Sequence, residues 1–504
     1  MRHPNPVLPG CHPDPSICRV GGDYYLVTST FAYFPGLPVH HSRDLVSWRL
    51  VGHVLDRPSQ LPLHGIGPSK GLYAPTIRHH DGVFHVVCTL VDGHGPSGNF
   101  LVTATDPAGP WSEPRWLDVD GFDPSLFFDD DGRTWLHGCR EVPSDRRGRT
   151  EVWLRELHDE GLGPETVIWT GSTPDAVWAE GPHLYKVDGH YVLVCAEGGT
   201  DVDHAVVAAR SRSITGPYEG HPRNPVLTHR EHGRDHQITG TGHADLVTTP
   251  DGDWWAVLLA MRPYGGYFYN LGRETFLAPV RWVDGWPEMD PVEETVEAPA
   301  LEPHPWPDIP ARDDFDAGAL DPSWFVLRTP DEPFWSFDRP GHLRLPLRPE
   351  RVTDLVTPSL VCKPQRHRDF AFECALDFAP RVAHESAGLV VLQDNDNHLR
   401  LTRDGDVLRL VRRLKGIDEV LATAPVTGPL LWLAFHARGQ DHQARYATGP
   451  DAWRDLGDPV DGRPLSTPVT GGFTGVHLGL YASANGREST AVADFDWAEY
   501  RELG

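Results

Sequence analysis

The chain has 504 residues, more than one ordinary hydrophobic core accommodates, so its length predicts two or more domains. Its formal net charge of -26 at pH 7 argues against nucleic acids and anionic membrane surfaces as partners. Hydrophobic residues make up 39% of the chain, which also has 50 glycines and 48 prolines, a combination typical of globular β-rich proteins with many turns.

The cysteines and the N-terminal residues bear on the cellular compartment. The seven cysteines are scattered, odd in number and mostly placed inside apolar runs, so we expect reduced core thiols without metal-ligand spacing. The N-terminal residues have no apolar signal core, and no stretch approaches the roughly 18 apolar residues of a membrane span. These features predict a cytoplasmic protein.

The first motif in the chain, GCHPDPSI over residues 10–17, places Asp14 between two prolines. Proline fixes its own φ and biases the preceding residue toward extended backbone, so this carboxylate sits on a stiff piece of chain. From this stretch alone, Asp14 is either a positioned catalytic group or a turn-forming aspartate, which is the more common role beside proline.

The motif returns four more times with the same order of parts. Each copy has a key residue, a short apolar segment, a polar turn about eight residues later and an aromatic-rich strand, and Asp-Gly turns between apolar segments indicate hairpins. The key residues are Asp14, Ala74, Asp123, Glu180 and His243. Five such copies, spaced about 50–60 residues apart, predict a five-bladed β-propeller of four-stranded blades.

A propeller brings the equivalent ends of its innermost strands together at the central axis. The five key residues should therefore face one another around one shallow cavity. Three of them are carboxylates, and crowding carboxylates at one mouth is electrostatically unfavourable. We interpret this crowding as a functional requirement.

The character of the chain changes after the fifth repeat. Residues 297–312 contain five prolines, typical of a semi-rigid linker, and short alternating strands with Gly and Asn/Asp turns follow to the end. We therefore predict a propeller catalytic domain over 1–296, a linker over 297–312 and a β-sandwich over 313–504 that helps to close the active-site pocket.

Paired carboxylates in a polar cavity are the apparatus of glycosidic bond hydrolysis. One must carry a proton for the leaving oxygen, and the other must be ionised to activate water or attack the anomeric carbon. A third carboxylate near the acid would raise the pKa of that acid through like-charge repulsion. A guanidinium such as that of Arg273 would favour the ionised form of the base.

Four motifs in chain order closely resemble glycoside hydrolase family 43: HPDPS at 12–16, FDPSLF at 122–127, AEGPHLYK at 179–186 and LGRET at 271–275. More narrowly, essentially the whole chain is similar to the two-domain β-xylosidases and α-L-arabinofuranosidases of that family. The resemblance implies an all-β protein, a five-bladed β-propeller followed by a concanavalin- or laminin-like β-sandwich, and an inverting mechanism.

The resemblance also implies roles for individual residues. Asp14 would be the general base, Glu180 the general acid, and Asp123 the residue that modulates the pKa of the acid and orients it. Arg273 would bind substrate beside the base, and His243 would occupy the floor of the channel.

Aromatic side chains would form the pocket wall. Phe31 matches a wall aromatic of the family, and Phe473 matches a C-terminal aromatic that closes the pocket, with a buried sandwich side chain as its alternative. Tyr73 stands where many β-xylosidases have tryptophan, which leaves the sugar specificity open. Trp178 is a further wall residue, with packing between blades as the alternative.

The leading functional hypothesis is an inverting exo-hydrolase that releases terminal β-D-xylose from xylo-oligosaccharides, a xylan 1,4-β-xylosidase. The near alternative is an α-L-arabinofuranosidase, or an enzyme with both activities. A retaining hydrolase, a non-catalytic carbohydrate-binding propeller and a protein-interaction propeller are the remaining alternatives.

We expect no required cofactor. The resemblance allows a Ca²⁺ ion near His243, whose alternative is a hydrogen-bonded core histidine. The expected partner is a small oligosaccharide, with no nucleic acid or membrane, and a homo-oligomer, a dimer or tetramer, is compatible with the sequence.

Overall fold

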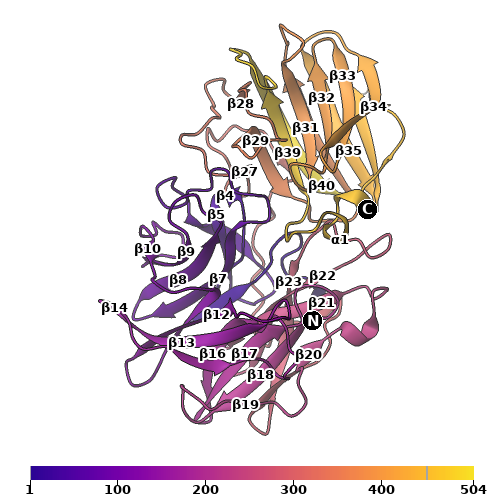
Figure 1. Ribbon diagram of the computed structural model, residues 1–504. Helices are drawn as coiled ribbons and strands as arrows, with labels where there is room; N and C mark the ends of the chain where they lie inside the picture. The colour runs from indigo at the N-terminus through magenta and orange to yellow at the C-terminus, as the bar shows by residue number, and fades with distance from the viewer. Residues whose placement is uncertain (1, 450–451) are drawn as a thin grey trace.

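The computed structural model describes residues 2–449 and 452–504, and the regular secondary structure of this part of the chain is almost wholly β-strand (Figure 1). The N-terminal part is a five-bladed β-propeller and the C-terminal part is a β-sandwich, as the sequence predicted. Between Glu297 and Arg312 the chain forms neither helix nor strand. No helix in the described ranges is long and apolar enough to span a membrane.

Each blade is an antiparallel sheet of four or five strands. Blade 1 contains β2 (Ser16–Val20), β3 (Asp23–Val27), β5 (Gly36–Ser42) and β6 (Arg49–Leu55), and blade 2 contains β7 (Gly71–His80), β8 (Val83–Val91), β9 (Gly98–Ala104) and β10 (Arg115–Trp116). Blade 3 contains β11 (Phe122–Phe128), β12 (Thr134–Glu141), β13 (Thr150–His158), β14 (Gly161–Leu162) and β15 (Thr166–Trp169). Blade 4 contains β16 (Glu180–Val187), β17 (His190–Glu197), β18 (Ala205–Ser211), β19 (Glu219–Gly220) and β20 (Leu227–Thr228). Blade 5 contains β21 (Thr239–Thr248), β22 (Trp254–Met261), β23 (Glu274–Val283) and β24 (Trp286–Met289).

The innermost strands β2, β7, β11, β16 and β21 form a closed ring, since each contacts the next and β21 contacts β2 again. A buried polar cluster ties the ring together at its axis. Asp245 of β21 forms an ion pair of 2.8 Å with Arg78 of β7, and it accepts hydrogen bonds from Ser16 of β2 and Tyr185 of β16. This carboxylate therefore joins four blades.

The backbone at the top of the inner strands differs from the sequence alignment in one blade. In every blade, the residue that precedes the proline of the motif (alanine in blade 5) has a left-handed φ. These residues are Asp14 (54°), Ala74 (26°), Asp123 (52°), Gly181 (56°) and His243 (52°). In blade 4 this residue is Gly181, so the alignment of Glu180 with Asp14 was wrong by one residue.

A β-bulge explains the shift. The pairing of β16 with β17 is interrupted between Glu180 and His183, as that of β11 with β12 is between Phe122 and Ser125. Glu180 is thus the last regularly paired residue before the bulge, and Gly181 occupies the left-handed bulge position. The third carboxylate reaches the axis from a backbone position different from that of the other two.

The sandwich consists of two eight-stranded sheets. The first contains β26 (Arg312–Asp313), β28 (Leu343–Pro346), β30 (Phe370–Asp377), β35 (Leu430–Arg438), β36 (Asp441–Ala447), β37 (Arg454–Asp455), β38 (Val460–Asp461) and β40 (Val492–Glu502). The second contains β27 (Phe325–Leu327), β29 (Ser359–Pro364), β31 (Ser386–Leu392), β32 (His398–Asp404), β33 (Val407–Leu414), β34 (Ile417–Pro425), β39 (His477–Ser483) and β4 (Tyr33–Phe34). Short elements complete the chain: β1 (Arg2–Pro4) paired with β25 (Thr295–Glu297), the 3₁₀ turns η1 (Arg230–His232) and η2 (Arg463–Leu465), and helix α1 (Thr467–Thr470).

Strand β4 makes the two parts of the molecule continuous. It belongs to the propeller part of the sequence, yet it pairs with β27 and becomes the edge strand of a sandwich sheet. One buried apolar cluster also runs from blades 1 and 2 into the sandwich, with Phe34 and Leu72 on one side and Phe325 and Leu478 on the other. Figure 1 shows the sandwich resting on the propeller beside β4 and β27, with α1 at the junction. This contact brings sandwich residues to the propeller axis.

Candidate active site

A cavity of about 690 Å³ lies at the end of the propeller axis that carries the carboxylates. All five blades line it, together with one loop of the sandwich. All nine residues singled out from the sequence lie on its wall: Asp14, Phe31, Tyr73, Asp123, Trp178, Glu180, His243, Arg273 and Phe473. The structure thus brings the whole predicted set together.

Asp14 is buried, and both of its carboxylate oxygens have hydrogen-bond partners. One carboxylate oxygen accepts a hydrogen bond of 2.9 Å from Arg273, and the other accepts one of 2.6 Å from the hydroxyl of Ser29. Burial by itself raises the pKa of Asp14, but Arg273, His243 and the Ser29 hydrogen bond outweigh it and hold that pKa below its usual value. Asp14 is therefore the carboxylate that stays ionised.

Asp123 lies in a different electrostatic environment. Burial, with the negative charge of Asp14 adding to it, raises the pKa of Asp123 to about 6, although His243 and Arg273 act against the shift. The backbone N–H of Gly181 donates a hydrogen bond of 3.0 Å to this carboxylate. Because Gly181 directly follows Glu180, Asp123 holds the backbone that carries the third carboxyl group.

Glu180 is the carboxyl group that keeps its proton. Burial raises its pKa well above the usual value, and the charges of Asp123 and Asp14 raise it further. The wall of the cavity therefore carries both an ionised carboxylate and a protonated carboxylic acid, the two forms that acid–base chemistry on one substrate requires.

Three aromatic rings and one guanidinium form a compact wall. Phe31, Tyr73 and Phe473 have ring centroids 5.7, 5.8 and 6.2 Å apart in pairs. The Arg273 guanidinium lies 5.6 Å from the Phe31 ring and 5.3 Å from the Phe473 ring. Phe473 thus contacts the propeller residues of the site instead of being confined to the sandwich core.

Trp178 lies between two loops that approach it closely. A Cβ on Gly148 would stand 2.6 Å from its indole nitrogen, and a Cβ on Gly199 would stand 2.9 Å from its ring. The backbone N–H of Trp178 donates a hydrogen bond of 2.7 Å to the Gly148 carbonyl, and Trp178 has a left-handed φ of 54°. Trp178 therefore packs between two loops of neighbouring blades and also lies on the cavity wall. The two interpretations of this residue, as a wall residue and as a packing residue, are compatible.

His243 lies near Asp14 and packs against the backbone next to Glu180. Its Nδ1 lies 4.0 Å from Asp14, and a Cβ on Gly181 would stand 2.8 Å from its ring. Calcium prefers six to eight oxygen ligands. Asp14 and His243 offer one carboxylate and one imidazole, and each Asp14 oxygen already accepts a hydrogen bond, so these two residues do not present such a set. The calcium site near His243 stays a prediction.

A histidine cluster lies outside the cavity. His229, His232 and His236 offer nitrogen atoms within 4.8 Å of one another. Both ring nitrogens of His229 already face backbone partners, the Ile238 carbonyl and the Val292 N–H. A metal would have to displace one of these hydrogen bonds, through which His229 ties its segment to Ile238 and Val292.

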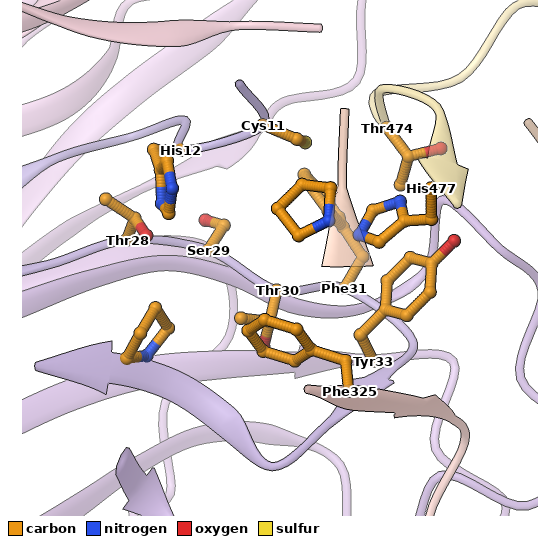
Figure 2. A pocket seen from close by; sticks show the side chains of 12 residues that line it. Cys11, His12, Thr28, Ser29, Thr30, Phe31, Tyr33, Phe325, Thr474 and His477 are labelled. Atoms are coloured by element: carbon orange, nitrogen blue, oxygen red, sulfur yellow. The ribbon is translucent and has the colours of Figure 1, made fainter. Parts of the chain in front are cut away.

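The sandwich reaches the site through the segment before β39. Figure 2 shows Thr474 and His477 of the sandwich beside Phe31 and Tyr33 of the segment between β3 and β5. These residues line a cavity of about 20 Å³. The rings of Tyr33 and His477 stack at 3.8 Å. The cavity has room for about one water molecule, so the interface behind the wall is closely packed.

Two hydroxyl groups at the site were not found from the sequence. Ser29 hydrogen-bonds Asp14, and Ser69 accepts a hydrogen bond of 2.9 Å from the Phe473 N–H. His204 also lines the cavity. Ser29 opens the run STFAYFPG from which Phe31 was taken, a weak local signal, whereas Ser69 lies in a loop with no motif.

A propeller whose axis gathers an ionised and a protonated carboxyl group beneath an aromatic cap defines a glycoside hydrolase. Comparison with known proteins identifies the family. The model for glycosyl hydrolases family 43 matches residues 3–287, and that for the β-xylosidase C-terminal concanavalin A-like domain matches residues 312–501. The chain belongs to glycoside hydrolase family 43, and it is a glycosidase of the β-xylosidase/α-L-arabinofuranosidase type.

The names of similar proteins include xylosidase and arabinosidase activities. A xylosidase/arabinosidase of Butyrivibrio fibrisolvens is 42% identical over 99% of both chains. A non-reducing-end α-L-arabinofuranosidase of Bacteroides ovatus is 43% identical over 99% of this chain and 94% of its own length. The solved structure of a xylan β-1,4-xylosidase from Bacillus halodurans is 37% identical, covers 99% of this chain and 100% of its own, and superposes with a TM-score of 0.94.

Proposed function

We propose that the protein is an inverting exo-hydrolase that removes single terminal β-D-xylosyl residues from xylo-oligosaccharides, with α-L-arabinofuranosyl residues as a second substrate of the same pocket. The observation that carries this proposal is the cap formed by Phe473, because a wall supplied by the second domain closes one end of the cavity. A closed end accepts the end of a chain and excludes its middle.

Two observations support the second substrate. Tyr73 occupies the wall position where many β-xylosidases have tryptophan, which gives the pocket a different shape and polarity. The relatives at 42% and 43% identity are described as a xylosidase/arabinosidase and as an α-L-arabinofuranosidase. Both terminal sugars are neutral pentoses, so the same charged groups serve both reactions.

In the proposed mechanism Asp14 is the general base and Glu180 the general acid. Asp14, held by Arg273 and Ser29, takes a proton from a water molecule whose oxygen attacks the anomeric carbon. The glycosidic C–O bond breaks on the opposite face, and the proton of Glu180 passes to the leaving oxygen. The configuration inverts in this single displacement. After the products leave, Asp14 releases its proton to solvent and Glu180 takes one up.

Asp123 supports this mechanism in two ways. Its negative charge raises the pKa of Glu180, so the acid keeps its proton at working pH. Its hydrogen bond from the Gly181 N–H fixes the peptide next to Glu180. Arg273 has the opposite electrostatic role, since it lowers the pKa of Asp14.

The sugar specificity is tested with paired substrates. An aryl β-D-xyloside and an aryl α-L-arabinofuranoside should both be turned over, and NMR of the first-formed xylose should show the α-anomer, since inversion converts a β-glycoside into an α-sugar. The Asp14→Asn protein, prepared in parallel, controls for contaminating glycosidases. Negligible turnover of both substrates would contradict the proposal, and β-xylose as the first product would contradict inversion.

The charge of Asp123 should be visible in the pH profile. The alkaline limb of kcat/KM reports loss of the proton from Glu180, and Asp123, whose pKa is about 6, is ionised in that range. Asp123→Asn removes the repulsion that raises the pKa of Glu180, so the alkaline limb should move to lower pH by roughly one unit. The acidic limb, which reports Asp14, should keep its position.

Glu141 offers a matched control for this measurement. It is an exposed carboxylate at the mouth of the cavity and is a minor contributor to the raised pKa of Glu180. Glu141→Gln should therefore shift the alkaline limb much less than Asp123→Asn. Equal shifts, or a shift of the alkaline limb to higher pH in Asp123→Asn, would be inconsistent with the role given to Asp123.

A further inference from the structure

The tip of one sandwich loop covers the cavity. This lid, defined as Gly471–Gly475, carries Phe473 and lies between α1 and β39. Gly471 and Gly472 are exposed, and Phe473 is half-buried. Thr474 and Gly475 are buried, so the first three residues of the lid are the part that needs specific contacts to hold the Phe473 ring in one place.

The two ends of the lid are anchored to the segment that precedes Arg273. Ser466 accepts a hydrogen bond of 3.0 Å from the Tyr269 N–H, and the Asn270 carbonyl accepts one of 2.8 Å from the Val476 N–H. The Asn270 side chain donates a further bond of 2.7 Å to the Gly462 carbonyl. These contacts fix where the lid begins and ends, but they lie several residues from the Phe473 ring.

The tip itself meets Ser69, in the loop between β6 and β7. The Ser69 hydroxyl accepts the hydrogen bond of 2.9 Å from the Phe473 N–H, and its carbonyl accepts one of 2.8 Å from the Tyr73 hydroxyl. A Cβ on Gly472 would stand 2.2 Å from the Ser69 hydroxyl oxygen, and Gly472 has a left-handed φ of 81°. Only glycine fits comfortably beside the hydroxyl in that conformation.

We propose that Ser69 is a positioning residue that latches the sandwich lid over the pocket, by fixing the Phe473 backbone and the Tyr73 ring from one point. The proposal rests on the proposed function, in which Phe473 caps the terminal sugar. Two of the three aromatic residues of the wall, one from each part of the molecule, hydrogen-bond to Ser69, while the Phe473 carbonyl also accepts a longer hydrogen bond of 3.4 Å from Arg273.

The latch should affect binding more than chemistry. The cap contacts the terminal sugar in the ground state and in the transition state alike, so loosening it removes uniform binding and raises KM with little change in kcat. Ser29 does not bond to the lid, and Arg273 contacts the Phe473 carbonyl through a different nitrogen, at 3.4 Å, from the one that binds Asp14 at 2.9 Å. The pH profile should therefore keep its shape.

Ser69→Ala tests the proposal, with Ser59→Ala as the matched control. Ser59 lies in the same loop, is exposed, and donates its hydroxyl to Glu113, away from the lid. Loss of one backbone hydrogen bond at the cap should raise KM about three- to tenfold in Ser69→Ala, with kcat within about twofold of the parent. Ser59→Ala should leave both constants unchanged, and thermal unfolding should show that both variants are folded.

A double-mutant cycle tests whether Ser69 affects KM through the Phe473 ring. If Ser69 acts through the lid, Ser69→Ala should raise KM far less in a Phe473→Ala background than in the parent. A full additional increase in that background, or an equal fall of kcat and kcat/KM in the single variant, would overturn the latch.

Amide hydrogen exchange can be measured without substrate. It therefore tests the latch independently of which sugar the enzyme releases. The peptide that spans residues 466–476 should exchange faster in Ser69→Ala than in the parent or in Ser59→Ala, because the Phe473 N–H loses its acceptor. Unchanged exchange would overturn the latch whichever substrate the enzyme turns over. Absent turnover of both aryl pentosides alongside faster exchange would overturn the proposed function and leave the latch standing.

Discussion

Replacing Asp14 with asparagine should lower kcat by about 10³- to 10⁴-fold, close to the full contribution of a general base. The substitution keeps the shape of the side chain and an oxygen that can accept the Arg273 hydrogen bond, but it removes the charge that takes the proton from water. No other group at the site combines an ionised carboxylate with this pairing, because burial raises the pKa values of Asp123 and Glu180. Steady-state kinetics on the preferred aryl pentoside measures the loss.

The buried charge of Arg273 makes a stability control necessary. Removing one partner of a buried ion pair can destabilise a protein strongly, so thermal unfolding and calorimetric binding of an oligosaccharide should accompany the kinetics. We expect a folded variant that still binds substrate. A folded Asp14→Asn protein with turnover near that of the parent would contradict the assignment of the base.

Replacing Glu180 with glutamine should produce a loss that depends on the leaving group. An amide cannot supply a proton, so turnover of oligosaccharides, whose sugar leaving groups need protonation, should fall by about 10²- to 10⁴-fold. An aryl group derived from a strongly acidic phenol departs without protonation, so the same variant should lose far less activity on that substrate. The alkaline limb of the pH profile should also vanish, because the group that titrates there is gone.

This comparison distinguishes a general acid from a binding residue. If Glu180 only held substrate, the loss would be similar for both leaving groups and would appear in KM. Asp14→Asn is the matched control, since loss of the base should slow both classes of substrate to a comparable degree. An equal loss on both classes in Glu180→Gln would contradict the role of general acid.

Much of the fold follows from local patterns that the sequence displays. Asp-Gly turns between apolar segments recur in register, and the structure has five blades whose inner strands close into a ring. The motif around Asp14 also predicted where the site lies. The fourth repeat was misaligned by one residue because Glu180 and Gly181 stand side by side, and only the bulge in β16 shows which of them occupies the left-handed position.

Local patterns did not predict the contacts between segments that are distant in the sequence. Strand β4 is two residues long, and nothing in its composition indicates that it completes a sheet of the sandwich. Ser69 lies in an irregular loop about 400 residues before Phe473, and a single serine carries no pattern. These contacts depend on how the two parts pack, which short-range propensities do not encode.

By itself the sequence determined the architecture, the family and nine of the residues on the cavity wall, because repeats, turns and motifs are local features that can be recognised in the sequence. Only the tertiary structure decided which carboxyl group is ionised and which keeps its proton, since those pKa values arise from burial and from charges on other blades. The structure also decided between the pocket wall and the sandwich core for Phe473, and it alone placed Ser69 against the lid, because both positions depend on the packing of the sandwich against the propeller.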